Sequence, residues 1–423
     1  MSTVLSIWVN QIRAAEIDVV AGAGFTFHYT QEWLHHQEKY PFSPHLPLGK
    51  TSGGAEVKNF FENLLPEGSA LDVAASTHNL SKHDAFGLLA KIGREAAGVM
   101  SIIPIDETPD AQITLRLLPF DEITQRIRER PTKSFSTWDR KVRLSIAGYQ
   151  DKLAVFIDQD QKMYLSDGGG SSTHIIKPEN INPELPFMPA NEYFCMRLAH
   201  ALKLLVPKTN LLRIPDPLYV IERYDRHKER DGHVNRLHQI DLCQVLNLPV
   251  EMKYQQSYEF SPEGASYTDL FQAADSTTNP AKTKIVLLRW VVFNYMIGNT
   301  DAHAKNVSFF LNHTGLRLAP FYDLVSGTIY GLKNMAMFIG KEEEIGLVSA
   351  IDWKEFCKQC DLKPTLLANE LRTQANHWGK FSTQLLNDEI YDPNEKNFLS
   401  GLAVDIDGRV HLMQQQALDL RSL

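Results

Sequence analysis

The sequence is poor in cysteine and lacks any stretch suited to entering a membrane. Four cysteines in 423 residues are too few for a disulfide scaffold, so we expect a reducing compartment. The longest apolar run, 285–298, is interrupted by Arg289 and is shorter than the roughly 20 residues of a membrane span. The N-terminus has no basic start and no signal-peptide pattern. These absences predict a cytoplasmic protein with no membrane partner, in which 285–298 forms a buried core helix.

Excess positive charge is also absent. The chain has 43 Lys and Arg against 51 Asp and Glu, a formal net charge of -8. A surface of this sign does not favour non-specific binding to nucleic acid or to anionic membranes. With 43% hydrophobic and 22% charged residues, the composition is that of a soluble globular protein, and the length predicts two or three domains.

A complete zinc-binding pattern is missing as well. Cys357 and Cys360 form a CxxC, but no second CxxC and no pair of histidines lies nearby to complete a site. The preceding residues, 353–356, have a helical pattern. We therefore interpret the CxxC as part of a helix and not as a metal or redox motif.

The residue patterns divide the chain into four parts. Residues 1–110 alternate strand-like runs with two helical patterns, and residues 111–140 are polar and charged and are expected to form a linker. Residues 141–385 begin with several short strands and continue with mostly helical periodicity, and residues 386–423 are expected to form a helical tail. A sheet-rich N-terminal subdomain followed by a mostly helical C-terminal lobe predicts an α+β protein with the bilobal fold of protein kinases.

The sharpest motif is a polar loop that follows the apolar run. Asp301 and Asn306 have the D-x-x-x-x-N spacing of a kinase catalytic loop. In this chemistry one carboxylate orients the substrate hydroxyl and accepts its proton, and a nearby amide oxygen holds magnesium against the ATP phosphates. The spacing alone also fits a plain polar loop after a core helix. His303, inside the loop, is either a nucleotide contact or a structural hydrogen-bonding residue.

A second candidate carboxylate lies further along the chain. Residues 318–323 form an apolar strand-like run that ends in Asp323. This placement suits the second magnesium ligand, which the DFG aspartate provides in kinases. Leu324 and Val325 follow it, so the ordinary DFG sequence is absent. The alternative is that Asp323 caps a turn.

Upstream, a lysine and a glutamate are candidates for the phosphate side of the site. Lys177 ends an apolar strand-like run, from which a lysine can reach ATP phosphates as the third-strand lysine of kinases does. Glu192 opens the next predicted helix. It either pairs with Lys177 or is an acid that stabilises the helix N-terminus.

No G-x-G-x-x-G motif stands where kinases carry their glycine-rich loop. The turn 147–152 lies between two predicted strands at that place, and Gly148 is its single glycine. Ala147 and Gly148 would still let backbone N–H groups approach a phosphate, and Lys152 adds charge. The glycine run at 167–172 is a rival, but it lacks the G-x-x-x-x-G-K-[ST] frame and is interpreted as a flexible connector.

Several motifs, in the correct order along nearly the whole chain, resemble the HipA family of toxin kinases. Residues 63–68 (NLLPEG) and 86–98 (FGLLAKIGREAAG) look like the family's N-terminal domain. The remaining motifs are 145–152 (SIAGYQDK), 173–178 (THIIKP), 221–226 (IERYDR), 237–244 (LHQIDLCQ) and those around Asp301 and Asp323. A set of this size in this order is specific.

The resemblance implies a role for each matching residue. Asp301 would be the catalytic base, with Asn306 and Asp323 binding Mg2+. Ser145 would be an autophosphorylation site, whose added negative charge repels the ATP phosphates. Residues 222–224 would form the hinge that holds adenine through backbone groups. The implied ATP-binding residues are Ala147, Gly148, Tyr149, Gln150, Asp151, Lys152, Lys177, Glu222, Arg223, Tyr224, His303, Ala304, Lys305, Asn306, Tyr322 and Asp323.

The resemblance also implies membership of a type II toxin–antitoxin pair. The expected partner is a HipB-like helix-turn-helix antitoxin dimer that neutralises the kinase and, together with it, represses their operon. Operator DNA would then be contacted mainly through the antitoxin. The implied serine/threonine substrate is an aminoacyl-tRNA synthetase, notably the glutamyl enzyme, whose phosphorylation would stop translation and growth.

Three positions depart from the family pattern. Tyr149 and Asp151 replace the Ala and Glu common in the loop, and Ile240 replaces a frequent acid. These departures bear on the choice of target more than on the phosphotransfer chemistry. Two other interpretations suit the same fold: a catalytically silent module that binds the antitoxin and assists repression, and a small-molecule kinase. Intact Asp301, Asn306, Asp323 and Lys177 favour an active enzyme over the silent module.

Overall fold

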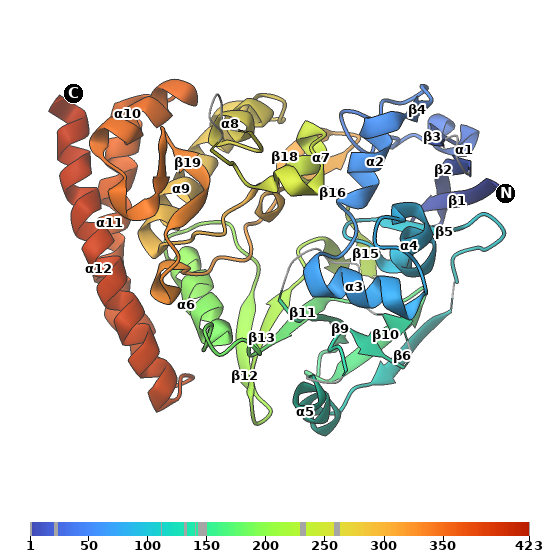
Figure 1. The fold of residues 1–423 in the computed structure, drawn as a ribbon, viewed down its shortest axis with the longest axis horizontal. Coiled ribbons are helices and arrows are strands. Elements are labelled where there is room, and N and C mark those ends of the chain that lie inside the picture. Colours follow the sequence, from blue (N-terminus) through green and yellow to red (C-terminus); the bar gives the residue numbers. More distant parts are fainter. Residues whose placement is uncertain are drawn as a thin grey trace. The chain divides into compact units, whose positions relative to one another are not determined.

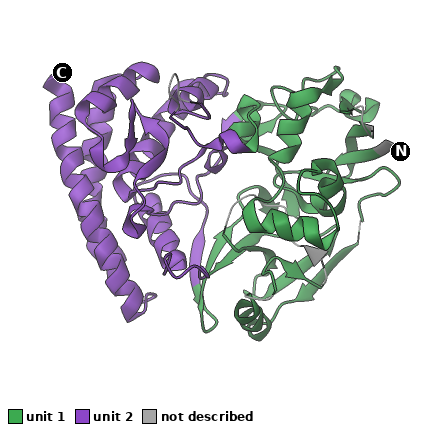
Figure 2. Cartoon of the chain, in the orientation of Figure 1, with its two compact units in different colours: residues 1–178, 212–250, 309–316 green, residues 179–211, 251–308, 317–423 purple. Residues whose placement is uncertain are grey.

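The structure is a computed structural model of the chain and describes residues 2–20, 24–110, 112–130, 133–139, 141–142, 150–228, 234–257 and 263–422. It contains two compact units, each assembled from several stretches of sequence (Figure 2). Unit 1 comprises Met1–Pro178, Leu212–Val250 and Phe309–Leu316, and unit 2 comprises Glu179–Leu211, Glu251–Ser308 and Arg317–Leu423. The mixture of sheets and helices confirms the expected α+β class.

The N-terminal residues of unit 1 form an antiparallel sheet with the strand order β4-β3-β2-β1-β5. Leu5, Ile7 and Val9 are buried and recur at every second position of β1, which is the spacing of side chains on one face of a strand. Helices α1, α2 and α4 contact this sheet. The elements are β1 (Ser2–Val9), β2 (Ile12–Val20), β3 (Gly24–Tyr29), α1 (Gln31–His35), β4 (Ser52–Gly53), α2 (Gly54–Glu62), α3 (Gly68–Thr77), α4 (Ala85–Ile92), η1 (Gly93–Glu95) and β5 (Met100–Pro104).

A second sheet in unit 1 carries residues expected to bind nucleotide. Its strand order is β12-β13-β11-β9-β10-β6 (Figure 1). In the register of β11 with β13, Lys177 lies opposite Tyr219 and His174 opposite Glu222. The strands are β6 (Ile113–Leu117), β9 (Leu153–Ile157), β10 (Met163–Gly168), β11 (His174–Pro178), β12 (Thr209–Arg213) and β13 (Pro217–Glu222), and the hairpin β7 (Thr137–Trp138) and β8 (Lys141–Val142) stands apart from them.

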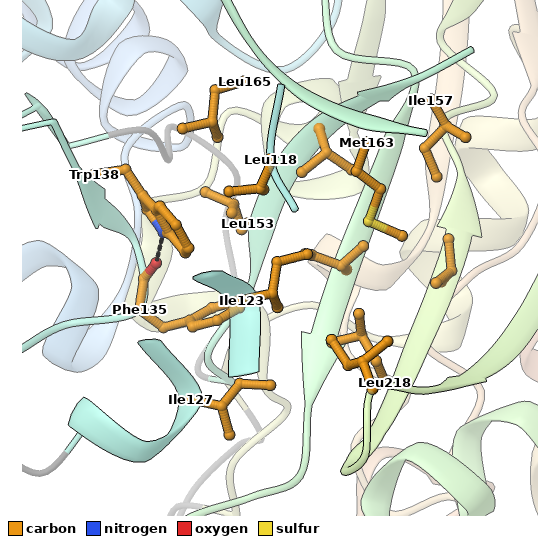
Figure 3. Close-up of a cluster of buried hydrophobic side chains, with 14 residues drawn as sticks. Leu118, Ile123, Ile127, Phe135, Trp138, Leu153, Ile157, Met163, Leu165 and Leu218 are labelled. Carbon is orange, nitrogen blue, oxygen red and sulfur yellow. Dashed lines mark hydrogen bonds between the residues drawn. The ribbon is translucent and has the colours of Figure 1, made fainter. Parts of the chain in front are cut away.

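The stretch 111–140, expected to be a linker, instead belongs to this second sheet and its core. Strand β6 pairs with β10, and helix α5 (Phe120–Glu129) buries Ile123 and Ile127 in the apolar cluster of Figure 3. Trp138 is in the same cluster, and its Nε1 donates to the Phe135 carbonyl oxygen at 2.5 Å. Charged residues dominate the composition of this stretch, but its few apolar residues recur at helical spacing, and burial of that face decides the structure.

Unit 1 also contains two smaller sheets and a short helix. They form β14 (Arg226–Lys228), β15 (Val234–Arg236), β16 (Gln239–Asp241) and α7 (Leu242–Leu246), and β16 pairs in a further sheet with β17 (Ser308–Asn312), which pairs with β18 (Gly315–Leu318). A capping box between Asp241 and Gln244 starts α7. Gln244 also accepts from Ser43 Oγ at 3.1 Å and donates to the Phe60 carbonyl oxygen at 2.9 Å. The 237–244 motif therefore attaches α7 to the N-terminal residues.

His238 lies in this motif and is buried. Its Nε2 is 2.8 Å from the Phe42 carbonyl oxygen, so this nitrogen carries the proton of the neutral ring. Burial lowers the pKa of His238 to about 4, although the hydrogen bond to Phe42 opposes the shift. The unfolded chain binds a proton at this residue near pH 6.5. The stability that depends on the neutral ring is therefore complete at pH 7 and decreases as the pH falls below about 6.5.

We expect the free energy of unfolding to decrease by about 2 kcal/mol between pH 7 and pH 5 through His238 alone. His238→Gln keeps a donor toward Phe42 and removes the titration, so its decrease over this interval should be smaller by that amount. Urea unfolding followed by tryptophan fluorescence at both pH values measures the difference. His313→Gln, at an exposed histidine, is the control and should behave as wild type. Equal pH dependence in the wild type and His238→Gln would contradict the prediction.

Unit 2 is predominantly helical. The predicted core helix is confirmed: residues 285–297 lie in α9 (Pro280–Ile297), most of whose C-terminal residues are buried. Helices α11 and α12 lie side by side (Figure 1), and α12 confirms a helix near the end of the chain. The other elements are α6 (Met188–Ala201), η2 (Val250–Lys253), α8 (Tyr267–Asp275), η3 (Ala304–Asn306), η4 (Thr328–Tyr330), β19 (Asn334–Ile339), β20 (Glu342–Glu344), η5 (Ile345–Leu347), α10 (Ala350–Gln359), α11 (Pro364–Leu386) and α12 (Pro393–Ser422).

The cysteines of unit 2 have structural surroundings. All four cysteines of the chain are free and buried. Cys357 lies in α10 and Cys360 directly follows it, and burial raises the pKa of both thiols, to about 12 for Cys357. A buried, protonated thiol is a poor nucleophile, so the CxxC forms part of the helix packing. In the described ranges, no helix is long and apolar enough to span a membrane.

Candidate active site

The candidate catalytic loop begins where α9 ends. Gly298 terminates the helix in the left-handed conformation, with φ of 70°. Asn299 then turns back on the helix, because its backbone N–H donates to the Asn294 carbonyl oxygen and its Nδ2 donates to Asn294 Oδ1, both at 2.9 Å. The rigid end of a buried helix thus determines where the loop starts.

Asp301 has a fixed backbone and an exposed side chain. Its N–H donates to Asn299 Oδ1 at 2.9 Å, and its carbonyl oxygen accepts from the N–H of His303 at 2.8 Å. The carboxylate is exposed and accepts a hydrogen bond of 2.6 Å from the Tyr254 hydroxyl at Oδ1. An immobilised backbone with an accessible carboxylate is what a general base requires.

Asn306 closes the loop onto Asp301. It ends the short helix η3, and its Nδ2 donates to the Asp301 carbonyl oxygen at 2.8 Å. Since the amide nitrogen makes this hydrogen bond, the amide oxygen is not used in it and can serve as a ligand. The D-x-x-x-x-N spacing is thus the spacing at which the asparagine side chain can hydrogen-bond to the aspartate backbone.

Asp323 lies in a loop whose preceding residues are fixed by contacts with α9 and with the candidate catalytic loop. Its φ of 57° is in the left-handed region, which aspartate tolerates better than most residues. Before it, the ring of Phe321 stacks on Trp290 with 5.5 Å between centroids. The Tyr322 hydroxyl donates to the Lys305 carbonyl oxygen at 2.6 Å, which connects this loop to the catalytic loop.

Asn191, which the sequence interpretation overlooked, holds the segment after Asp323. Its Oδ1 accepts from the Ser326 N–H and its Nδ2 donates to the Ser326 carbonyl oxygen, both at 3.0 Å. The side chain is fully buried on α6. An amide among apolar residues of a buried helix is the sequence signal that points to such a residue, because a buried amide needs partners.

Helix α12 supports the same loops from the C-terminal end of the chain. Arg409 donates from Nε to the Met296 carbonyl oxygen at 2.9 Å and from Nη2 to Asp405 Oδ2 at 2.7 Å. Asp405 also accepts from Thr328 Oγ1 at 2.6 Å. The i, i+4 spacing of Asp405 and Arg409 was a visible signal, but their long-range contacts with the loops were not.

Glu192 differs from the sequence expectation in one respect. Helix α6 begins at Met188 with Pro189 in its first turn, so Glu192 lies beyond the first turn and does not open the helix. It is also buried, and its position beyond the first turn contradicts the alternative of an acid that stabilises the helix N-terminus. Lys177 belongs to unit 1 and Glu192 to unit 2, and their pairing stays a prediction.

Within unit 1, the candidate phosphate-binding residues lie on the second sheet. Lys177 is buried on β11, with its Nζ 5.8 Å from the Tyr219 ring centroid, and Lys152 is buried beside the start of β9. Asp151 Oδ2 lies 3.7 Å from Arg130 Nη1. Burial raises the pKa of Asp151, although the charge of Arg130 opposes this shift. Ser145, Ala147, Gly148 and Tyr149 lie outside the described residues, and Gln150 lies inside them.

The predicted hinge, 222–224, follows the end of β13. Arg223 is buried, its N–H donates to the Thr173 carbonyl oxygen at 2.8 Å, and its Nη2 donates to Asp225 Oδ2 at 2.7 Å. Burial raises the pKa of Asp225, but the charges of Arg223 and Arg226 outweigh it and hold this pKa far below its usual range. The side chain and the backbone N–H of Arg223 are both used inside the protein, and its expected contact with adenine stays a prediction.

The same network attaches the hinge to the N-terminal residues of unit 1. Asp225 Oδ2 accepts from the Gly98 N–H, and the Gly98 carbonyl oxygen accepts from Arg226 Nη1, both at 3.0 Å. Gly98 has φ of 75°, and a Cβ there would lie 3.1 Å from the backbone nitrogen of Gln239. Its lack of a side chain permits this close approach.

The donor set of unit 2 fits magnesium. Asn306 offers an amide oxygen and Asp323 a carboxylate, and Mg2+ prefers such hard oxygen ligands, commonly one or two from the protein with the rest from water and phosphate. Among the residues that the structure describes, no group of three His, Cys, Asp or Glu side chains forms an alternative metal site. His303, Ala304 and Lys305 are buried beside these ligands, and their contact with nucleotide stays a prediction.

The chain is similar to known proteins over most of its length. The model of the HipA N-terminal domain matches residues 5–103, and that of the HipA-like C-terminal domain matches residues 144–379. The serine/threonine-protein kinase toxin HipA of Shewanella oneidensis is 34% identical over 379 residues, which cover 87% of this chain and 86% of that protein. The putative kinase Y4mE of Sinorhizobium fredii is 31% identical over 427 residues, which cover 97% of this chain and 98% of that protein.

A solved structure extends the similarity to the fold. The Shewanella oneidensis HipA toxin, determined with HipB and its operator DNA, has a TM-score of 0.88 and 30% identity, covering 99% of both chains. The two family models together match more than half of this chain. The expected kinase-like fold is thus confirmed, and the chain belongs to the HipA family of kinases.

Proposed function

We propose that this kinase transfers the γ-phosphate of ATP to a serine or threonine hydroxyl of a protein. Asp301 accepts the proton of that hydroxyl, and Asn306 and Asp323 hold Mg2+, which when bound neutralises charge on the phosphates. The observation that carries the proposal is the closed loop in which Asn306 Nδ2 bonds the Asp301 backbone at 2.8 Å. The loop leaves the Asp301 carboxylate exposed and keeps the Asn306 amide oxygen out of this hydrogen bond.

Residues of unit 1 bind ATP in this proposal. Lys177 and the loop 147–152 bind the phosphates, and 222–224 binds adenine through its backbone. His303, Ala304, Lys305 and Tyr322 are further proposed nucleotide contacts. Ser145 is the proposed autophosphorylation site. The buried, strand-held position of Lys177 supports this assignment, because a lysine with little conformational freedom loses little entropy on binding phosphate.

We infer the partners of this kinase from the Shewanella oneidensis HipA toxin, whose structure was solved with HipB and operator DNA. We infer a toxin neutralised by a HipB-like helix-turn-helix dimer, with which it represses their shared operon. The net charge of -8 supports DNA contact mainly through the antitoxin. The substrate is an aminoacyl-tRNA synthetase, with the glutamyl enzyme foremost, and its phosphorylation in the cytoplasm stops translation.

Phosphoproteomics after brief expression tests the proposal. Wild type should add phosphate to serine or threonine of a small set of proteins, with a tRNA synthetase among them, and should arrest growth. Asp301→Asn should give neither effect while still binding the antitoxin. New phosphosites that are equal in the two strains would contradict the kinase assignment. Repression of the operon without any phosphorylation by wild type would favour the catalytically silent module.

A further inference from the structure

Tyr254 is the side chain that reaches the carboxylate of the proposed base. Its hydroxyl donates to Asp301 Oδ1 at 2.6 Å, a length typical of a hydrogen bond between a hydroxyl and a charged carboxylate. In the described part of the chain, no other side chain is hydrogen-bonded to this carboxylate. The backbone of Asp301 is anchored by Asn299, His303 and Asn306, so among the described side chains Tyr254 is the one whose hydrogen bond restrains the rotation of the carboxylate.

Hydrogen bonds of the next residue and a ring contact hold Tyr254 in place. The next residue, Gln255, donates from its N–H to the Ala336 carbonyl oxygen and accepts from the Phe338 N–H with its side chain, both at 2.8 Å. These two bonds attach the segment to strand β19. The tyrosine ring packs edge-to-face on His303, with 5.0 Å between centroids, and this contact fixes the ring with its hydroxyl on Asp301.

A glycine lets the opposing strand approach Tyr254. Gly264 has φ of 88°, and a Cβ there would meet the Tyr254 carbonyl oxygen and lie 3.1 Å from the Met252 carbonyl oxygen. Ala265 donates to Met252 at 2.9 Å, and Gln256 exchanges backbone hydrogen bonds with Glu263. The segment 252–256 is therefore braced by 263–265 as well as by β19, which makes the position of the tyrosine a property of the fold.

We propose that Tyr254 is a positioning residue for phosphotransfer, holding Oδ1 of Asp301 so that Oδ2 faces the acceptor hydroxyl. The inference rests on the proposed function, in which Asp301 is the base. Without the phenol, the carboxylate rotates freely, and only a fraction of its orientations can accept the proton. A hydrogen bond to a charged group is commonly worth enough to change a rate about ten- to a hundredfold.

The test measures phosphate incorporation from γ-labelled ATP and Mg2+ into the full chain and into casein as an added acceptor. Tyr254→Phe should lower the rate at saturating ATP about ten- to a hundredfold. The KM values for ATP and casein, and the affinity for a fluorescent ATP analogue, should stay as in wild type. Tyr164→Phe is the matched control, because the Tyr164 hydroxyl also donates to an aspartate, Asp158 at 2.8 Å, on the β9–β10 hairpin. This control should keep the wild-type rate.

Three results would overturn the inference. An unchanged rate in Tyr254→Phe would show that Asp301 needs no partner. A higher rate or a lower KM for casein would show that Tyr254 competes with the acceptor, and phosphate on Tyr254 by mass spectrometry would make it an acceptor. Asp301→Asn is measured in parallel: if it retains the wild-type rate, the proposed base is wrong, whereas loss in Asp301→Asn with no loss in Tyr254→Phe rejects only the role of Tyr254.

Discussion

Replacing Asp301 by asparagine is expected to lower the rate of ATP-dependent phosphate incorporation by about 100- to 10,000-fold. The amide has the shape of the carboxylate but cannot accept the proton of the acceptor hydroxyl. The hydrogen bonds that anchor residue 301 to Asn299, His303 and Asn306 involve its backbone N–H and carbonyl oxygen. They should survive the substitution, so the loss is chemical and the fold is retained.

The rate is measured with γ-labelled ATP at saturating concentration, together with the affinity for a fluorescent ATP analogue and the midpoint of urea unfolding. The last two should be unchanged. Asp275→Asn is the control, because Asp275 is an exposed aspartate at the end of α8, paired with Lys284 at 2.8 Å, and its loss should not affect turnover. A rate in Asp301→Asn within threefold of wild type would show that another group accepts the proton.

Gly298→Ala should be strongly destabilising. Its φ of 70° is unfavourable for alanine, and a Cβ would meet Thr328 Oγ1 and lie 2.7 Å from a guanidinium nitrogen of Arg409. Strain and crowding together should lower the free energy of unfolding by about 2–5 kcal/mol. Phosphotransfer should also fall, because the Gly298 carbonyl oxygen accepts from the N–H groups of Gly327 and Thr328 and so aligns the two loops.

Comparison with Gly331→Ala distinguishes the effect of crowding on stability from the effect of backbone strain. Gly331 also has a left-handed φ, of 80°, but nothing lies within 4 Å of a Cβ placed there. Its substitution should cost only the strain, about 1–2 kcal/mol, with activity retained. Urea unfolding of both variants measures the contrast. If the two glycine variants lost equal stability, the close approach of Thr328 and Arg409 to Gly298 would be unimportant.

The C-terminal helix α12 supports the loops of the candidate active site. Arg409 and Asp405 connect α12 to the end of α9 and to Thr328, and Arg409 is buried. Asp405 is half-buried, and its removal would leave the buried guanidinium of Arg409 without this charged partner. The loops that carry Asp301 and Asp323 are therefore supported by residues far from them in sequence.

Local sequence patterns were sufficient to predict the elements whose structure depends on residues close in sequence. The buried helix α9 followed from an apolar run, and the proximity of Asp301 and Asn306 followed from a spacing that one short turn satisfies. Where composition and periodicity disagreed, composition misled. The charged stretch 111–140 looked like a linker, yet Ile123 and Ile127 pack in a core, because a few apolar residues on one helix face suffice for burial.

The sequence by itself determined the family, the α+β class and the loop that joins Asp301 to Asn306, because each is written in contiguous residues or in motif order. Only the tertiary structure revealed Tyr254 on the Asp301 carboxylate, Asn191 on Ser326 and Arg409 on Met296. Each of these contacts joins segments distant in the chain, and its partner is selected by packing and by the need of buried polar groups for hydrogen bonds. Spacing along the chain carries no information about such partners.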